Sequence, residues 1–189
     1  MPEDASRSLD EHLELVGAVR GLLPDVSTIA QVVVDAYERG GRVYAFGNGG
    51  SSADAQHLVE ELVARYRRER RALPATSLSA DSATLTCIGN DFGFDDVFAR
   101  QVQGHVRQGD VVFAFTTSGR SENVVRGLAA AREAGATTVL FAGGDGGPAR
   151  EQADYALVVP SSSTARVQEM HVLLMHVLLD PVDAWAAGE

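Results

Sequence analysis

The feature that most constrains this chain is a repeated alternation of short apolar runs with helical segments. Apolar runs typical of buried strands occupy residues 42–46, 110–115, 137–142 and 155–159. Strands that alternate with helices predict a parallel sheet whose two faces are both covered by helices. The pattern therefore predicts an α/β fold.

Helical periodicity fills most of the chain around these strands. Helices are expected over residues 9–22, 27–38, 53–68, 122–134 and 164–186. Pro24 is expected to stop the first helix, and Gly40-Gly41 to cap the end of the second. The stretch 73–107 is assigned a short strand at 76–78 and two helices.

Two loops rich in glycine and hydroxyl groups follow the strands at 42–46 and 110–115. They are Gly47–Ser52 (GNGGSS) and Thr116–Ser121 (TTSGRS). Each loop lies between a strand and a helix, where unpaired N–H groups and the helix dipole favour a phosphate. Turns with N-caps are the alternative for one such loop, but two in one sheet favour binding. Neither loop contains Lys or a nucleotide-binding glycine pattern, which disfavours a nucleoside triphosphatase or a dinucleotide enzyme.

Composition narrows the class of protein further. The 189 residues are 45% apolar and carry a formal net charge of −10, without a linker or a repeat. One domain over residues 1–189 is expected, and binding of nucleic acid is disfavoured. No apolar run approaches the roughly 20 residues of a membrane span, and the first residues do not resemble a signal peptide. We therefore expect a cytoplasmic protein.

Two local features are interpreted conservatively. The run Arg65–Arg71 (RYRRERR) holds five arginines and is predicted to be a solvated helix end. A subunit contact or a position near an anionic ligand is the alternative. The single cysteine, Cys87, is predicted to be a small buried apolar group rather than a nucleophile.

Longer motifs add a family resemblance. The strand–TTSGRS–helix unit resembles the sugar isomerase (SIS) domain, and the runs 47–66, 87–102 and 164–176 resemble phosphoheptose isomerase segments in the family's order. The resemblance implies an SIS-type three-layer sandwich with a central parallel sheet, N-terminal helices and a long C-terminal helix. It also implies isomerisation of sedoheptulose 7-phosphate to D-glycero-D-manno-heptose 7-phosphate, one zinc ion per subunit, and a homotetramer with active sites between subunits.

The resemblance also assigns roles to residues. Substrate contacts are expected at Asn48, Gly49, Gly50, Ser51, Glu61, Asn90, Asp91, Thr116, Thr117, Ser118, Ser121 and Gln168. Metal ligands are expected at His57, Glu61, Gln168 and His176. The catalytic acid–base pair is expected at Glu61 and His176. Relatives commonly have Ser in place of Thr116, but the hydroxyl group is retained.

Helix geometry qualifies the ligand set. His57 and Glu61 are four residues apart, so they share a helix face, although alone they would be an ordinary helix contact. Gln168 and His176 are separated by roughly 12 Å of helix rise, too far to bind one ion from one straight helix. At least one of them is therefore predicted to serve a neighbouring subunit's site. His171 is predicted to be a packing or interface histidine.

The assigned residues suit an aldose–ketose isomerisation through an enediol-like intermediate. Glu61 is the expected carbon base, and His176 the expected acid–base group for the oxygens. Two alternatives remain open, namely a regulatory binding module that keeps only the fold, and an SIS enzyme for another phosphosugar. Glu61, Gln168 and His176 favour the enzyme, and the 87–102 segment with the His57/Glu61 pair favours the heptose substrate.

Overall fold

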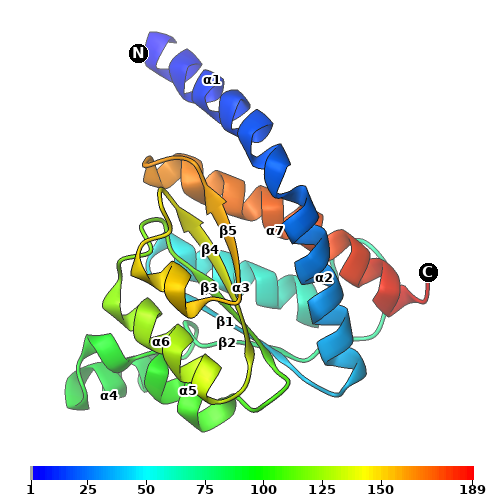
Figure 1. Cartoon of the computed structure of the whole chain (residues 1–189), viewed down its shortest axis with the longest axis vertical. Coiled ribbons are helices and arrows are strands. Elements are labelled where there is room, and N and C mark those ends of the chain that lie inside the picture. Colours follow the sequence, from blue (N-terminus) through cyan, green and yellow to red (C-terminus); the bar gives the residue numbers. More distant parts are fainter. Residues whose placement is uncertain (1) are drawn as a thin grey trace.

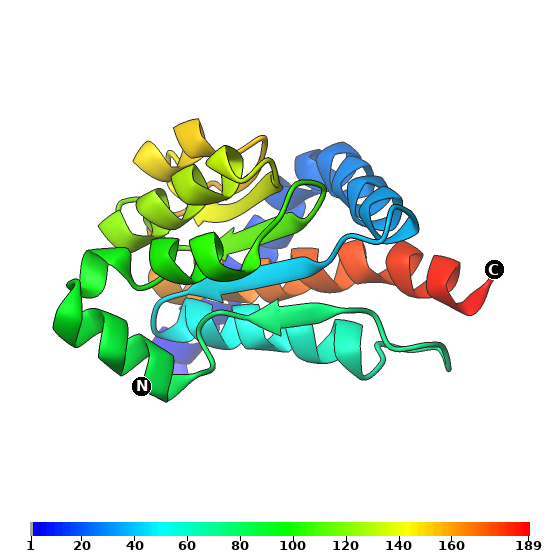
Figure 2. The ribbon, with the colours of Figure 1, turned by 90° about the horizontal axis from the view of Figure 1, so that it is seen from below.

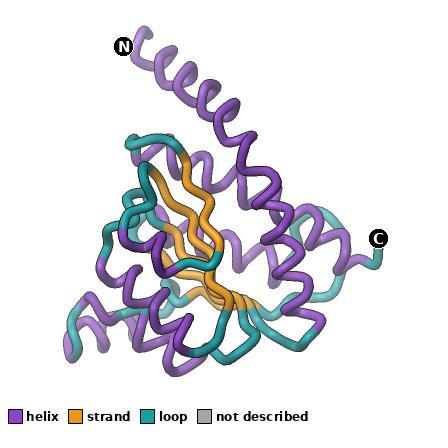
Figure 3. The backbone as a smooth tube through the Cα atoms, in the orientation of Figure 1, coloured by secondary structure: helices purple, strands orange, loops and turns teal. Residues whose placement is uncertain are grey.

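A five-stranded parallel sheet forms the centre of the molecule (Figure 3). The structure is a computed structural model that describes residues 2–189, with side chains from Ser6 onward. The strands are β1 (Val43–Gly47), β2 (Ala75–Ser77), β3 (Val111–Phe115), β4 (Thr137–Gly143) and β5 (Tyr155–Val159). They lie in the order β2-β1-β3-β4-β5, and the pairings between them are parallel.

Seven α-helices surround the sheet in the described part of the chain (Figure 1). They are α1 (Pro2–Val19), α2 (Leu23–Glu38), α3 (Gly50–Val63), α4 (Ser82–Asp91), α5 (Ala99–His105), α6 (Glu122–Glu133) and α7 (Thr164–Ala187). Short 3-10 turns occupy Arg20–Leu22, Phe94–Asp96 and Pro148–Gln152. The expected three-layer α/β fold, with N-terminal helices and a long C-terminal helix, is confirmed.

Alternation along the strands divides the interior into two cores. Val43 and Ala45 of β1 pack into a core formed with α2, α3 and α7, whereas Tyr44 and Phe46 pack into a core formed with α5 and α6. Successive strand side chains point to opposite faces, so apolar residues at every strand position build both cores at once. The helix α1 projects away from this body (Figure 1).

Helices α3 and α7 lie side by side on one face of the sheet and run in the same direction (Figures 1 and 2). Each begins beside the carboxyl end of the strand that precedes it. The first residues of α3 therefore lie beside the first residues of α7, and later residues of α3 lie beside later residues of α7. This pairing decides which functional side chains can meet.

Three local predictions were wrong. The helix expected over 53–68 begins at Gly50 and ends at Val63, so the arginine run is not a helix end. The side chain of Arg70 is instead buried, with 1% of it exposed, because it binds carbonyl groups and an aspartate.

Cys87 is exposed rather than buried, because it lies on the outer side of α4. Pro24 does not end the first helical pattern but lies in the first turn of α2, where proline costs no hydrogen bond.

Over residues 2–189, no helix combines the length and the apolar character that a membrane crossing requires.

Candidate active site

The two glycine and hydroxyl loops meet at the carboxyl edge of the sheet. Gly47 of β1 pairs with Phe115 of β3, so the loops that follow these strands are neighbours. A cavity of about 200 Å³ lies between them. It is lined by Asn48, Gly50, Ser51, Phe115, Thr116, Thr117, Ser118, Ser121, Thr164 and Gln168.

Three glycines allow the loops to approach their neighbours. A Cβ atom at Gly47 would lie 2.6 Å from the carbonyl oxygen of Ser51, and one at Gly119 would lie 1.8 Å from that of Gly146. Gly119 also has a φ of +67°, which favours glycine. A Cβ at Gly50 would lie 2.2 Å from Nε2 of Gln168, so the absence of a side chain there makes room for Gln168 beside the cavity.

The helices α3 and α6 begin at this cavity, so the positive ends of their dipoles face it. Gly49 and Ser121 precede α3 and α6, and the Ser121 hydroxyl makes no capping hydrogen bond in the described structure. The hydroxyl oxygen of Thr116 accepts a hydrogen bond from the N–H of Gly119 at 3.1 Å, and this shapes the second loop. The positive ends of two helices, together with several hydroxyl groups, suit a phosphate.

Two amide side chains join the two loops, and one of them, Asn123, was not among the residues expected at the site. Asn48 and Asn123 exchange hydrogen bonds at 2.8 and 3.0 Å, and Asn123 is 2% exposed. Asn123 lies in the first turn of α6, directly after Ser121 and Glu122, and the sequence gives no local signal of its role. The pair holds the loop of β1 against the loop of β3.

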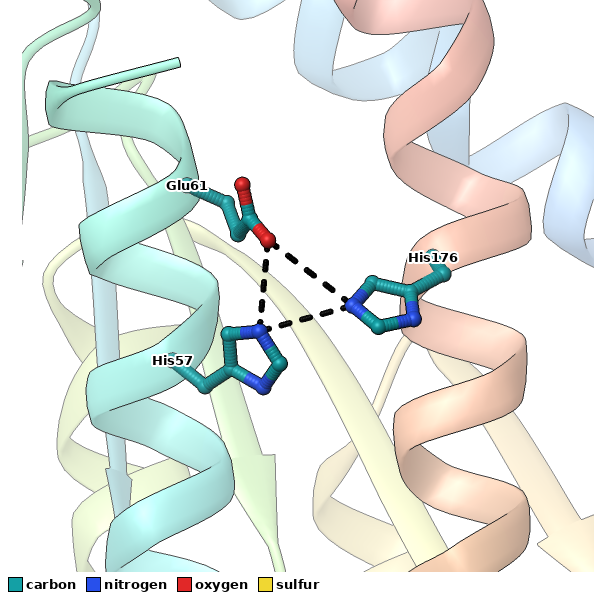
Figure 4. Close-up of side chains that lie close together, drawn as sticks. All are labelled: His57, Glu61 and His176. Carbon is teal, nitrogen blue, oxygen red and sulfur yellow. Dashed lines mark hydrogen bonds and ion pairs between the residues drawn. The ribbon is translucent and has the colours of Figure 1, made fainter. Parts of the chain in front are cut away.

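Farther along α3 and α7, three side chains converge (Figure 4). Nε2 of His57 lies 3.2 Å from Oε1 of Glu61 and 3.4 Å from Nε2 of His176, and His176 lies 3.8 Å from Glu61. The three are half-buried and form a possible metal-binding group.

The donor set of this cluster fits zinc. Bonds of about 2.0–2.1 Å in a tetrahedron put neighbouring ligand atoms about 3.3 Å apart, close to the three distances found. Two imidazoles and one carboxylate leave a fourth position for a substrate oxygen, as in catalytic zinc sites.

The electrostatics of His176 also suit a ligand. Burial lowers the pKa of His176, and the neighbouring His57 and Arg67 add to the effect, while Glu61 opposes it. The neutral imidazole, which is the form that binds a metal, is therefore favoured near pH 7. The ring of Tyr66 stacks on His176 with 5.4 Å between centroids.

The structure separates the fourth expected ligand from the other three. Gln168 lies at the cavity, next to Gly50 and near the start of α7, whereas His176 lies eight residues farther along this helix. Within one chain it therefore belongs with the loops, as the eight-residue separation implies. Asn90 and Asp91 are also apart from the cavity, exposed at the end of α4, where their side chains contact each other at 2.7 Å.

A buried pair lies between the cavity and the cluster. His171 is fully buried and packs against Phe115 and Phe141, so the prediction of a packing histidine is confirmed. Its Nδ1 lies 3.9 Å from Oδ2 of Asp54. Burial lowers the pKa of His171 to about 4 and raises that of Asp54 to about 6, so His171 is neutral at pH 7.

Comparison with known proteins first defines the class. A family model described as the SIS domain matches residues 14–143. The fold and the paired loops are therefore those of an SIS-domain protein.

Comparison with individual proteins then narrows the class. The phosphoheptose isomerase of Geobacter sp. (strain M21) is 47% identical over 97% of this chain and 96% of that protein. That of Aquifex aeolicus (strain VF5) is 49% identical over 82% of this chain and 81% of that protein.

Solved structures agree with this assignment. The phosphoheptose isomerase of Neisseria gonorrhoeae superposes with a TM-score of 0.91 at 35% identity, covering 97% of this chain and 98% of that one. The Francisella tularensis enzyme gives 0.92 at 33% identity, covering 96% and 97%. The chain belongs to the phosphoheptose isomerase family of SIS-domain proteins.

Proposed function

We propose that this protein, as a single SIS domain over residues 1–189, isomerises sedoheptulose 7-phosphate to D-glycero-D-manno-heptose 7-phosphate. The observation that carries the proposal is the arrangement along α3 and α7. Both helices begin at the cavity between the two loops, and farther along α3 carries His57 and Glu61 while α7 carries His176. A phosphate and a reacting carbon at opposite ends of one open-chain sugar need such a separation.

The cavity would hold the phosphate. Hydroxyl groups of Thr117, Ser118 and Ser121, aided by the positive dipole ends of α3 and α6, would donate to its oxygens. A chain with a net charge of −10 does not attract an anion by its overall field. The local donors must therefore supply the affinity.

Glu61 would move the proton between the two reacting carbons. The contacts of Glu61 with His57 and His176 both involve Oε1, which leaves Oε2 for the proton (Figure 4). This division reconciles a ligand role with a base role for one carboxylate. His176 would transfer protons at the sugar oxygens through Nδ1, since its Nε2 is the atom that would bind the metal. A zinc ion held by His57, Glu61 and His176 would polarise those oxygens as a Lewis acid.

The remaining assigned residues lead us to propose a shared site in a homotetramer. Asn90 and Asp91 are exposed at the end of α4 and do not line the cavity of their own chain. We propose that they bind the sugar hydroxyls in a neighbouring subunit's site. Gln168 would contact substrate in its own cavity, and any ligand role for it would lie in a neighbour's metal site.

Turnover tests the reaction. The protein is incubated with sedoheptulose 7-phosphate, and the aldoheptose 7-phosphate is followed by NMR. Glu61→Gln should lower kcat by about 10²- to 10⁴-fold, the usual contribution of a positioned base. Glu60→Gln, on the exposed side of the same turn, is the matched control and should stay active. A wild-type protein that is inactive with zinc present would refute the isomerase and favour a regulatory module.

Mixing inactive chains tests the shared site. Glu61→Gln and Asp91→Ala chains are unfolded together and refolded as a mixture, so that mixed tetramers form. If Asp91 serves a neighbour's site, some mixed sites contain both wild-type residues, and activity returns. A mixture as inactive as its components, at tetrameric mass, would refute the placement of Asp91.

A further inference from the structure

The chain turns back after α3 and lies against α7 over Ala64–Arg71, the return segment. It contains the arginine run, to which no role has been given so far. Leu73 follows it into the core, and its N–H binds the carbonyl oxygen of Leu62 at 3.1 Å. The segment therefore closes a tight loop around the end of α3.

Arg70 of the return segment caps the last turn of α3. Its Nη2 donates to the carbonyl oxygen of Glu61 at 2.6 Å, and its Nη1 donates to that of Leu62 at 2.8 Å. The last four carbonyl groups of a helix have no partner within the helix. Val63 ends α3, so Glu61 lies in this last turn and its backbone depends on the cap.

Asp183 of α7 holds Arg70 in place. Nε of Arg70 donates to Oδ1 of Asp183 at 3.0 Å, and both side chains are 1% exposed. Oδ2 of Asp183 accepts from the backbone N–H groups of Arg67 and Arg68 at 3.1 and 2.8 Å. Burial raises the pKa of Asp183, but these hydrogen bonds together outweigh it, so the pKa stays below the usual aspartate value.

The same segment also touches the catalytic histidine. The ring of Tyr66 stacks on that of His176 at an interplanar angle of 21°, and the guanidinium of Arg67 lies 4.9 Å from the centre of the Tyr66 ring. His176 and Asp183 are seven residues apart, two turns of helix, so they share one face of α7. The segment thus contacts the backbone of Glu61 and the ring of His176 from one anchored position.

We propose that the return segment, locked by the Arg70–Asp183 pair, is the positioning element that holds Glu61 and His176 at metal-binding distance. Arg70, Asp183 and Tyr66 act through the cluster residues and do not touch the reacting atoms. The catalytic part of this inference rests on the proposed function, whereas the effect on metal binding does not.

Affinity for zinc alone tests the inference without an activity assay. Metal-free wild type, Arg70→Met, Asp183→Asn and Tyr66→Leu are titrated with Zn²⁺ in competition with a chromophoric chelator. Loss of such supporting groups typically weakens metal binding about 10- to 100-fold, and we expect this loss in all three variants. Tyr66→Phe keeps the stacked ring and should bind zinc like the wild type.

Steady-state kinetics distinguish positioning from simple destabilisation. In the three variants, kcat should fall by about the same factor as zinc affinity, while KM changes little, because the phosphate cavity lies at the other end of α3. Leu128→Ala, in the core on the opposite face of the sheet, is the control. It should lower the Tm and leave zinc affinity and kcat unchanged.

Zinc affinities of Asp183→Asn and Tyr66→Leu that match the wild type would overturn the proposal. So would an equal loss in Leu128→Ala. If Arg70→Met does not fold, Asp183→Asn and the two Tyr66 variants decide the question. A wild-type protein that binds zinc but turns over no heptose phosphate would refute the proposed function. The zinc titration alone would then decide whether the return segment positions the cluster.

Discussion

The two faces of the sheet bury different kinds of side chain. On the face covered by α3 and α7, the described interior holds His171, Asp54 and the Arg70–Asp183 pair beside the apolar residues. On the face covered by α5 and α6, the core is mainly apolar, and charged groups such as Arg126 lie at the surface.

This difference has an energetic meaning. A buried ionisable group costs free energy unless it is paired, so it is retained where it serves a purpose. The ionisable groups on the first face lie between the cavity of the two loops and the His57–Glu61–His176 cluster, or just beyond that cluster. The comparison therefore assigns the His57–Glu61–His176 cluster and its supporting charges to the first face and mainly stability to the packed core of the second, and each of the following experiments can break that division.

Zinc should stabilise the first face specifically. A ligand that binds only the folded state at 100 times its Kd adds about 2.7 kcal/mol to the free energy of unfolding. Zinc should therefore raise the Tm of metal-free wild type, and removing it should lower turnover at least about 100-fold, given the contribution of metal polarisation. A His57→Asn protein should gain no Tm from zinc. Stabilisation of that variant as large as that of wild type would place the ion elsewhere.

A cavity in the second face should cost stability without affecting chemistry. Phe98 is 2% exposed and stacks on Phe46 with 4.7 Å between centroids. Phe98→Ala should lower the free energy of unfolding by about 3–5 kcal/mol, as measured by urea denaturation. The folded fraction should keep the wild-type kcat. A large loss of kcat in fully folded protein would mean that the two faces are coupled.

Acid should destabilise the protein through His171. Its folded-state pKa of about 4 lies below the unfolded value, so the unfolded chain binds more protons as the pH falls through this range. The resulting loss is about 3 kcal/mol between pH 6.5 and 4. Asp54, with its raised pKa, acts in the opposite direction, so the wild type must be compared with His171→Leu.

The measurement is urea unfolding of both proteins at several pH values. The free energy of unfolding of the wild type, relative to that of His171→Leu, should fall by about 3 kcal/mol as the pH falls from 6.5 to 4. A difference that does not change with pH would mean that His171 titrates normally in the folded protein.

A methyl group at the cavity should affect both stability and binding. Gly50→Ala would force Gln168 out of its position, at a cost of about 1–3 kcal/mol, and should raise KM about 10-fold. Gly104→Ala in α5 is the matched control, because a Cβ there meets nothing within 4 Å. That control should leave KM unchanged. An unchanged KM in Gly50→Ala would show that Gln168 does not contribute to substrate binding.

The smallest effect is expected from the surface of the second face. Arg126 contacts Glu122 at 2.7 Å and Asp96 at 3.1 Å, but all three are solvent-exposed. Arg126→Ala should therefore leave the Tm and kcat close to those of the wild type. A marked Tm loss, measured by thermal melting, would show that exposed ion pairs also stabilise this face.

Much of the fold was predictable from local patterns. Apolar runs bounded by loops gave each strand to within about two residues, since a buried parallel strand must be apolar on both faces. The two glycine and hydroxyl loops were predictable for the same local reason. The end of α3 was not predictable, because residues 64–68 have helical propensity. The hydrogen bonds that hold them outside the helix come from the distant Asp183.

The candidate site shows the same division between what local sequence patterns predict and what tertiary packing decides. His57 and Glu61 share a helix face by spacing alone, so the sequence determined that they could act together. Family resemblance added His176, but only the packing of α3 beside α7 places it 3.4 Å from His57 and leaves Gln168 at the cavity. Asn123, Arg70 and Asp183 gave no local signal of their roles. Their partners lie far away in the chain, and contacts of that kind are decided only when helices and strands pack.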